Sequence, residues 1–305
     1  MSTLVSEAED TSRSLVSTAS TSLSIQIEED DNSTDAFIKP ENNIPQEMWK
    51  GVLAFALCAF CAFLNTLMLS IIHDYMPSYG PLPDISFTLS KYTPSLLYYN
   101  ELIMVILTGT ALIICIFHKY RWVLVRRLFI IAALLYFGRL FTLFMTQLPK
   151  ADIYYQCAPK FTDANRTIKG VFLRAIEVFF AGGLQVKAEG NLCGDYLYSG
   201  HTITLVLTAL FINEYAPKRL KHIHFLTWSL ALLGMAFLLI SRGHYTIDVV
   251  ISYWLTTRIF WEYHTFASNP ILMRDTSAHN HFQKYGWIFV CQSMEKNCKT
   301  PVPNV

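Results

Sequence analysis

The chain has 305 residues, of which 52% are hydrophobic and only 15% are charged, and its formal net charge at pH 7 is +1. A mean hydropathy of +0.32 excludes an ordinary soluble domain. The basic residues lie in short stretches between apolar runs, which is typical of membrane orientation and argues against nucleic acid as a partner. We therefore expect an all-α, polytopic membrane protein.

The first 47 residues differ from the rest of the chain. They contain ten acidic and two basic residues, many serines and threonines, and no hydrophobic periodicity. We predict that 1–47 is a disordered acidic tail in the cytosol. Because the chain does not start with a basic and then an apolar stretch, we expect no cleaved secretory signal, and the apolar run near Gly51 should remain as a signal anchor.

Six apolar runs follow, and each approaches the roughly 20 residues that are needed to cross a bilayer. We predict membrane spans at 51–72, 98–117, 128–147, 199–215, 223–241 and 245–263. These six transmembrane helices define a catalytic domain over 48–265, which is followed by a cytosolic C-terminal tail over 266–305.

The orientation follows from the basic residues of two short loops. The 118–127 loop contains four Lys or Arg residues and the 216–222 loop contains three. Both loops should therefore be cytosolic, together with both chain termini, and three loops should lie on the opposite side.

Several cysteines and one asparagine have meanings that depend on this topology. Cys157 and Cys193 share the long non-cytosolic loop, where they fit either a disulfide or two free thiols. The sequon at Asn165 lies on the side where glycosylation takes place, and fits either a modified or a bare asparagine. Cys291 and Cys298 of the cytosolic tail fit either palmitoylation or unmodified thiols.

Two polar stretches, Cys193–Thr202 and His244–Asp248, open the fourth and sixth predicted spans. Since the spans alternate in direction, His201, His244 and Asp248 should reach one membrane face at a similar depth. His244 and Asp248 are four residues apart, which on a helix places them on the same face. Asp248 can then accept the ring N–H of His244 and leave its other nitrogen as nucleophile or base, while His201 protonates a departing alkoxide. We predict that these three residues are catalytic in a reaction at phosphorus.

Other residues are candidates for binding the substrate. Ser199 and Gly200 open a helix whose free N–H groups favour a phosphate. Arg139 lies 12 residues beyond Arg127, about 18 Å along the third span, and should pair with a phosphate or with a carboxylate such as Glu101.

The loop before the fourth span contributes one more candidate, Asp195, which fits either contact with a head group or a structural cap. We expect no metal or other cofactor, because no Cys/His cluster has metal-ligand spacing. The remaining histidines are expected at the surface or the membrane interface: His73, His118, His222, His224 and His264.

These stretches resemble the sphingomyelin synthases, a branch of the lipid phosphate phosphatase superfamily. Cys193–Thr202 matches the family's CGD…SGHT block, and His244–His264, HYTIDVVISYWLTTRIFWEYH, matches its second catalytic block almost throughout. Weaker matches are Pro81–Asp84 (PLPD) and the third span from Arg126 to Thr142. The resemblance covers roughly 50–265. It adds Tyr136, in the third span, to the substrate-binding candidates.

The resemblance implies transfer of phosphocholine from phosphatidylcholine to the primary hydroxyl of ceramide, with release of diacylglycerol. It puts the catalytic triad on His201, His244 and Asp248 and requires no metal. Either His244 attacks phosphorus first, or ceramide attacks directly with His244 as the base. A Golgi and a plasma-membrane location both fit a site on the lumenal or extracellular face.

Two other functions fit the same sequence. A phosphatidylethanolamine donor would give ceramide phosphoethanolamine, and a non-catalytic lipid transporter or scaffold would retain the fold. Arg242-Gly243-His244 departs from the phosphatase branch, whose arginine lies further before the histidine, so simple lipid phosphatase activity is not expected. Any oligomeric state is compatible with the sequence.

Overall fold

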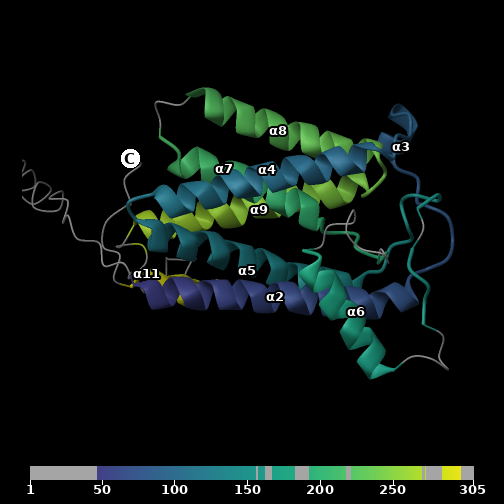
Figure 1. Ribbon diagram of the computed structural model, residues 1–305, viewed down its shortest axis with the longest axis horizontal. Helices are drawn as coiled ribbons and strands as arrows, with labels where there is room; N and C mark the ends of the chain where they lie inside the picture. The colour runs from purple at the N-terminus through teal and green to yellow at the C-terminus, as the bar shows by residue number, and fades with distance from the viewer. Residues whose placement is uncertain are drawn as a thin grey trace, which may run out of the picture. The chain divides into compact units, whose positions relative to one another are not determined.

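The computed structural model describes residues 47–155, 157–161, 167–182, 192–217, 221–269, 272 and 284–296. Contacts divide the chain into a unit over Met1–Ile44 and a unit over Pro45–Val305, and the description below concerns the second unit. In the described part of this unit the regular structure is helical, without strands (Figure 1). The acidic tail up to residue 46, Asn165 and Cys298 lie outside the described residues.

Each of the six predicted apolar runs forms a helix. Four of these helices are long and apolar enough to cross a membrane: α2 (Met48–Tyr75), α4 (Leu96–Phe117), α5 (Arg121–Met145) and α8 (Lys221–Ile240). The other two are α7 (Gly200–Tyr215), which has only 16 residues, and α9 (Thr246–Ser268), which contains Asp248, Arg258 and Glu262. The structure therefore supports an integral membrane protein with four helices of spanning length and composition. The two further helices, α7 and α9, contain His201 and Asp248.

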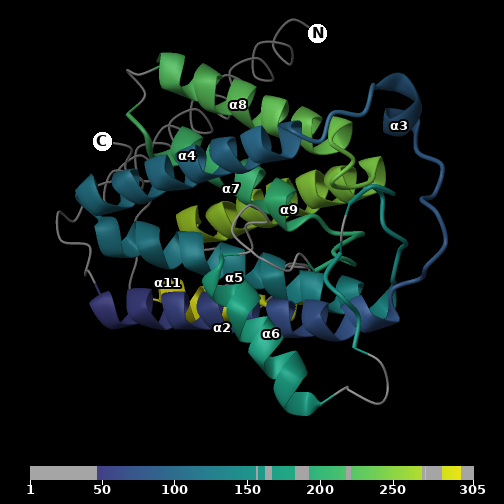
Figure 2. The same cartoon turned by 45° about the vertical axis from the view of Figure 1, so that its right-hand side comes forward.

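Helix α7 runs through the middle of the bundle, with α4, α8 and α9 packed around it (Figures 1 and 2). Its residues are apolar on all sides and most of them are buried, as expected for a helix surrounded by others. Gly234 of α8 allows this close packing, because a Cβ there would lie only 3.0 Å from Cδ1 of Leu205 on α7. Since α7 is enclosed, the histidine near its first turn is enclosed as well.

Helix α2 pairs with α5, and the shorter amphipathic α6 (Ile168–Phe180) crosses one end of α2 (Figure 2). The side chain of Ser70 on α2 donates a hydrogen bond to Val171 O on α6, at 2.9 Å. Arg174 of α6 forms an ion pair with Asp74 of α2, at 3.0 Å. The five-residue α3 (Ile85–Leu89) lies in the loop between α2 and α4.

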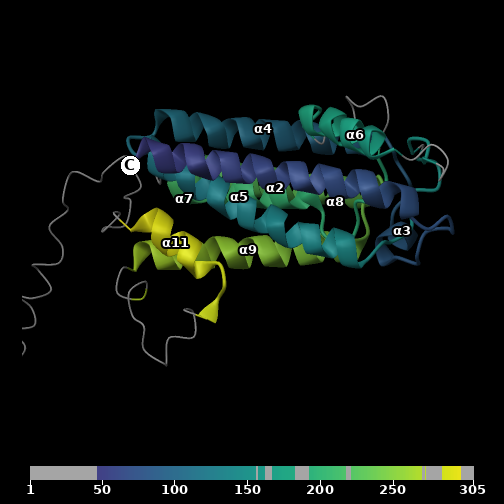
Figure 3. The same cartoon turned by 90° about the horizontal axis from the view of Figure 1, so that it is seen from below.

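The C-terminal tail contains α11 (Ile288–Glu295), which packs beside α9 (Figure 3). Its last residue, Glu295, is buried and forms ion pairs with Arg126 (3.1 Å) and Arg127 (3.0 Å) near the start of α5. The hydroxyl of Tyr263 on α9 donates to the same carboxylate. This polar cluster holds α11 at the end of the bundle opposite the first turns of α7 and α9.

Candidate active site

The structure brings the three predicted catalytic residues together. His201 lies in the first turn of α7, and His244 immediately precedes α9. The centroids of the two imidazole rings are 5.9 Å apart. Asp248 lies in the first turn of α9, and its Oδ2 is 3.2 Å from Nδ1 of His244. Two imidazoles and a carboxylate from distant parts of the sequence therefore form one cluster.

The pairing of His244 with Asp248 differs in detail from the expected arrangement on a single helix. Helix α9 starts only at Thr246, and Asp248 accepts the backbone N–H of Tyr245 (3.0 Å) as a capping residue. Its other oxygen accepts the backbone N–H of Leu197 (2.9 Å). With Nδ1–H of His244 donating to this carboxylate, Nε2 of His244 is the nitrogen left for chemistry.

The loop before α7 is shaped to reach Asp248. Gly194 has a φ of +111°, and Leu197 has a φ of +75°, a left-handed conformation that is uncommon for a leucine. The Leu197 N–H is the group that binds Asp248, so the strained residue makes a contact at the centre of the cluster. Ser199 then caps α7 by accepting the N–H of Thr202, at 3.2 Å.

The predicted substrate-binding residues form a second layer around this loop. Arg139 donates to Tyr198 O (2.8 Å) and Asn65 Oδ1 (3.2 Å), and forms an ion pair with Asp195. The carboxylate partner of Arg139 is thus Asp195, not Glu101. Gly200 packs against the guanidinium, because a Cβ there would lie 3.4 Å from Cζ of Arg139.

Tyr136 lies one helical turn before Arg139 on α5. Its carbonyl accepts a hydrogen bond from Asn65 Nδ2 (2.8 Å), and the oxygen of the same Asn65 amide accepts a hydrogen bond from Arg139.

The Asp195 carboxylate is held in its charged form by its neighbours. Burial alone would raise the pKa of the Asp195 carboxyl, but the Arg139 guanidinium, with His244 and His201 nearby, lowers it on balance. Asp195 therefore stays ionised beside the cluster.

A cavity of about 410 Å³ opens beside these residues. Of the predicted site residues, His244 and Asp195 line it, whereas His201, Asp248, Arg139, Ser199, Gly200 and Tyr136 do not. Tyr196 lies in the wall, with its ring edge-on to His244 at a centroid distance of 6.0 Å. His244, whose Nε2 is not used by Asp248, therefore has a cavity beside it.

Two residues near the cluster were not predicted to belong to the site. Arg242 lines the cavity with a φ of +55°, and its guanidinium lies over the rings of Phe87 and Tyr92, 5.3 Å from each. Glu101 of α4 is buried, with Oε1 3.8 Å from Nε2 of His201. A carboxylate inside an apolar span is itself a signal, because burying one in a membrane is unfavourable unless it has a function or a partner.

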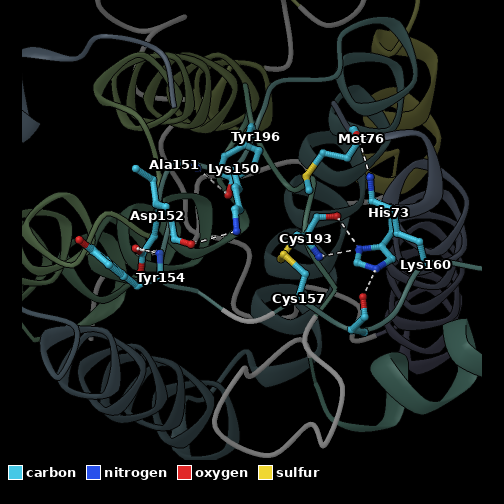
Figure 4. Close-up of a disulfide and its surroundings, with 12 residues drawn as sticks. His73, Met76, Lys150, Ala151, Asp152, Tyr154, Cys157, Lys160, Cys193 and Tyr196 are labelled. Atoms are coloured by element: carbon cyan, nitrogen blue, oxygen red, sulfur yellow. Dashed lines mark hydrogen bonds between the residues drawn. A yellow bond between two sulfur atoms is a disulfide. The ribbon is translucent and has the colours of Figure 1, made fainter. Parts of the chain in front are cut away.

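The loop is anchored by a disulfide and a buried histidine (Figure 4). Cys157 and Cys193 form a disulfide that closes a sequence separation of 36 residues. Nδ1 of His73 on α2 accepts the Cys193 N–H (2.9 Å), and Nε2 is 3.0 Å from Ala158 O (Figure 4). The expectation that His73 is interfacial is wrong: its side chain is fully buried because it satisfies backbone groups of both half-cystine segments.

The PLPD stretch caps α9 from the first loop. Asp84 accepts both the N–H (2.8 Å) and the hydroxyl (2.6 Å) of Thr246. Burial alone would raise the pKa of the Asp84 carboxyl, but hydrogen bonds from Ser86 and Thr246 lower it on balance. Asp84 thus remains a charged acceptor at the start of α9, next to His244.

Comparison with known proteins gives the class first. Residues 192–265, which contain both histidines and Asp248, match the family model described as PAP2 superfamily C-terminal. The fold and the matched region thus define a helical membrane protein whose segment over 192–265 is similar to the PAP2 superfamily C-terminal model.

Longer similarities cover most of the chain. It is 40% identical over 266 residues to phosphatidylcholine:ceramide cholinephosphotransferase 1 of Caenorhabditis elegans (87% of this chain, 56% of that protein). It is 38% identical over 263 residues to the Homo sapiens protein of the same name (85% and 62%). It is also 34% identical over 265 residues to phosphatidylcholine:ceramide cholinephosphotransferase 2 of Rattus norvegicus (86% and 72%). The chain belongs to the phosphatidylcholine:ceramide cholinephosphotransferase, or sphingomyelin synthase, family, and it spans 56–62% of the length of the first two relatives.

Proposed function

We propose that the protein transfers phosphocholine from phosphatidylcholine to ceramide and so forms sphingomyelin and diacylglycerol. The observation that carries this proposal is the convergence of His201 and the His244–Asp248 pair beside a cavity, within a member of this family. The sequence similarity over most of the chain supports the choice of substrates.

In the proposed mechanism, Nε2 of His244 attacks the phosphorus of phosphatidylcholine. The bond between phosphorus and the diacylglycerol oxygen breaks, and protonated His201 gives its proton to that oxygen. Ceramide then enters, its primary hydroxyl attacks the phosphohistidine, and its proton passes to His201 as the phosphorus–nitrogen bond breaks. Oε1 of Glu101 lies 3.8 Å from Nε2 of His201, within ion-pair range, so a Glu101 carboxylate would stabilise the protonated form of His201.

The alternative, direct attack by ceramide with His244 as the base, uses the same residues in a single displacement. A rapid-quench experiment with phosphatidylcholine labelled in its phosphate separates the two routes. The two-step route predicts label on the protein when ceramide is omitted, which is lost in His244→Ala. Direct attack predicts that the protein stays unlabelled.

The surrounding residues have supporting roles in this proposal. Asp195 reaches the head group from the cavity wall, and Arg139 positions Asp195. Ser199 and Gly200 hold the start of α7 against Arg139, and Tyr136 holds Asn65, which also receives Arg139. The position of Asp195 at the head group thus depends on a layer of residues that do not touch the substrate.

We also propose that all six helices span the bilayer, with both termini cytosolic and the cavity on the lumenal or extracellular side of the Golgi or plasma membrane. The basic residues of the 118–127 loop support this orientation. The disulfide next to the cavity supports an oxidising compartment on that side. Cysteine labelling of intact cells at Tyr79 and at Lys221 variants tests it, because these exposed residues, in the loop between α2 and α4 and at the start of α8, should lie on opposite sides.

Purified protein in phosphatidylcholine vesicles with labelled ceramide tests the function. Labelled sphingomyelin, absent with His244→Ala, is the expected result. Labelled ceramide phosphoethanolamine, formed only when phosphatidylethanolamine is supplied, would instead identify the other head group. Absence of any product, with ceramide movement across the vesicle retained, would identify a transporter or scaffold.

A further inference from the structure

A second part of the cavity wall has no role in the mechanism proposed above. It consists of Tyr92, Asp152 and Tyr154, and is called the tyrosine wall below. Tyr155 and Tyr196 also line the cavity. Four tyrosines and two carboxylates, Asp152 and Asp195, therefore share one cavity with His244.

Asp152 carries a buried negative charge in this wall. Its side chain accepts hydrogen bonds from the Tyr92 hydroxyl and, at 2.9 Å, from the Tyr154 N–H. The residue is only 6% exposed, and among the residues that the structure describes no ion pair joins it to a cation. A buried carboxylate of this kind attracts a cation from the cavity.

Tyr92 presents a ring that already attracts a cation. The guanidinium of Arg242 lies 5.3 Å from its centroid, and the Tyr154 ring lies 5.8 Å away at an interplanar angle of 32°. Burial, together with the Asp152 carboxylate, raises the pKa of Tyr92 to about 12, so the phenol remains neutral and donates to Asp152 at physiological pH. The ring is thereby fixed in the wall.

We propose, on the basis of the function proposed above, that the tyrosine wall receives the quaternary ammonium of a choline head group while Arg242 binds its phosphate. Aromatic faces and a nearby negative charge are what a quaternary ammonium requires, because it has no N–H to donate. A primary ammonium needs direct acceptors for three N–H groups. Each oxygen of Asp152 already receives one hydrogen bond, so fewer of its acceptor positions remain for the N–H groups of a primary ammonium, whereas its charge is available to either cation.

The arrangement also assigns a role to Arg242. Its left-handed backbone lies in the cavity wall two residues before His244. Its Nη2 donates a long hydrogen bond to Phe87 O (3.4 Å), and its Nε has no hydrogen-bond partner among the described residues. A guanidinium with free N–H groups is a strong ligand for phosphate oxygens. Arg139, by contrast, is engaged by Tyr198, Asn65 and Asp195.

Donor selectivity tests the proposal. Initial rates of transfer to ceramide are measured with vesicles of phosphatidylcholine or of phosphatidylethanolamine, for the wild type, Tyr92→Leu and Asp152→Asn. In Tyr92→Leu, we expect KM for phosphatidylcholine to rise on the order of tenfold. The ratio of the kcat values for the two donor lipids should change little in the same variant. Tyr92→Phe, which keeps the ring, should retain more of the preference for phosphatidylcholine. The control is Tyr79→Leu, at a tyrosine that is 60% exposed and outside the cavity wall, and it should retain all of this preference.

Binding of free phosphocholine and free phosphoethanolamine, measured by calorimetry, separates this proposal from the proposed function. Tighter binding of phosphocholine that is lost in Tyr92→Leu would support the tyrosine wall even if no transfer occurs. If Tyr92→Leu and Asp152→Asn lowered the transfer rate equally for both donor lipids, or did not lower it for either, the proposed role of the tyrosine wall would be overturned. Arg242→Gln should weaken both compounds alike, because both carry the phosphate.

Discussion

The two ends of the helical bundle both contain histidines together with buried arginines and carboxylates, yet they use them differently. At the end that carries α11, His264 has both ring nitrogens engaged, Nδ1 with Phe260 O (2.8 Å) and Nε2 with the Tyr215 hydroxyl (2.9 Å). At the other end, His244 is bound through Nδ1 to Asp248, and its Nε2 has a cavity beside it.

The comparison extends to the arginines. Arg127 binds Glu295 and Tyr215, so its charge is used within the protein. Arg242 shares its charge with aromatic rings and retains an Nε without a partner among the described residues. Residue type and burial alone therefore do not identify a reactive site. What distinguishes it is a positioned polar group that still has an unused donor or acceptor next to a cavity.

The largest effect should come from replacing His244, and the same replacement at His264 is the comparison. His244→Ala should lower transfer by about 10⁴-fold or more, because it removes the group that attacks phosphorus or accepts the ceramide proton. His264→Ala should leave transfer within about threefold and lower the stability by about 1–3 kcal/mol, because the Tyr215 O–H loses its acceptor, although Arg127 still donates to the Tyr215 oxygen. Transfer rates and thermal unfolding of the two purified variants check this, and equal losses of activity would contradict the comparison.

His201→Ala should give the next largest effect. Loss of the proton donor should reduce transfer by about 10²- to 10⁴-fold while His244 remains in place. The reduction should be smaller for a donor lipid whose leaving group is a more acidic alcohol, since that oxygen needs less protonation. A loss that is independent of the leaving group would point to a structural role for His201.

The disulfide should have an intermediate effect. Replacing both Cys157 and Cys193 by serine should lower stability by about 3–4 kcal/mol, because the closed loop of this length no longer restricts the unfolded chain. We expect transfer to fall about tenfold as the Cys193–Ser199 loop loosens around Asp248. Cys115→Ser, in α4 and outside the disulfide, is the matched control, and unfolding curves with transfer rates are the measurement. Full activity of the double variant would show that His73 alone fixes the loop.

The ion pair at α11 should affect transfer least. Burial alone would raise the pKa of Glu295, but Arg127 and Arg126 lower it below its ordinary value of 4.5. Its stabilising contribution is therefore present above that ordinary value and is lost as the pH falls through the lowered one. Hydrogen exchange of α11 should stay slow down to about pH 5 in the wild type and become fast in Glu295→Gln at neutral pH, with transfer changed by about twofold or less. Rapid exchange in the wild type at pH 7 would contradict this role.

The sequence predicts those features that depend on local pattern. Each long apolar run forms a helix, because in such a run only a helix satisfies the backbone within the segment. Ser199 and the glycine after it indicate the start of α7 because a serine cap is a local interaction. The proximity of His201 to His244 could be inferred because alternating spans place their starts on one face. Their catalytic roles and the six-span topology remain predictions.

Features that depend on long-range contacts could not be inferred. His73 contacts Cys193 over 120 positions, and Asp84 contacts Thr246 over 162, so nothing near these residues in sequence indicates the partner. Several carboxylates in the sequence could have formed an ion pair with Arg139. The structure has Asp195 as the partner, directly after the positive-φ residue Gly194. Helix α11 has only eight residues, too few to produce a clear hydrophobic period.

Tyr245 has a consequence for the biosynthesis of the protein. Its hydroxyl accepts the Leu82 N–H (3.1 Å) and donates to Pro149 O (3.2 Å), while its own N–H binds Asp248. One residue at the start of the last long helix therefore joins two loops that emerge from the ribosome much earlier. Until translation has delivered α9, Tyr245 cannot join these loops, so the proposed transfer would begin only when insertion of the bundle is complete.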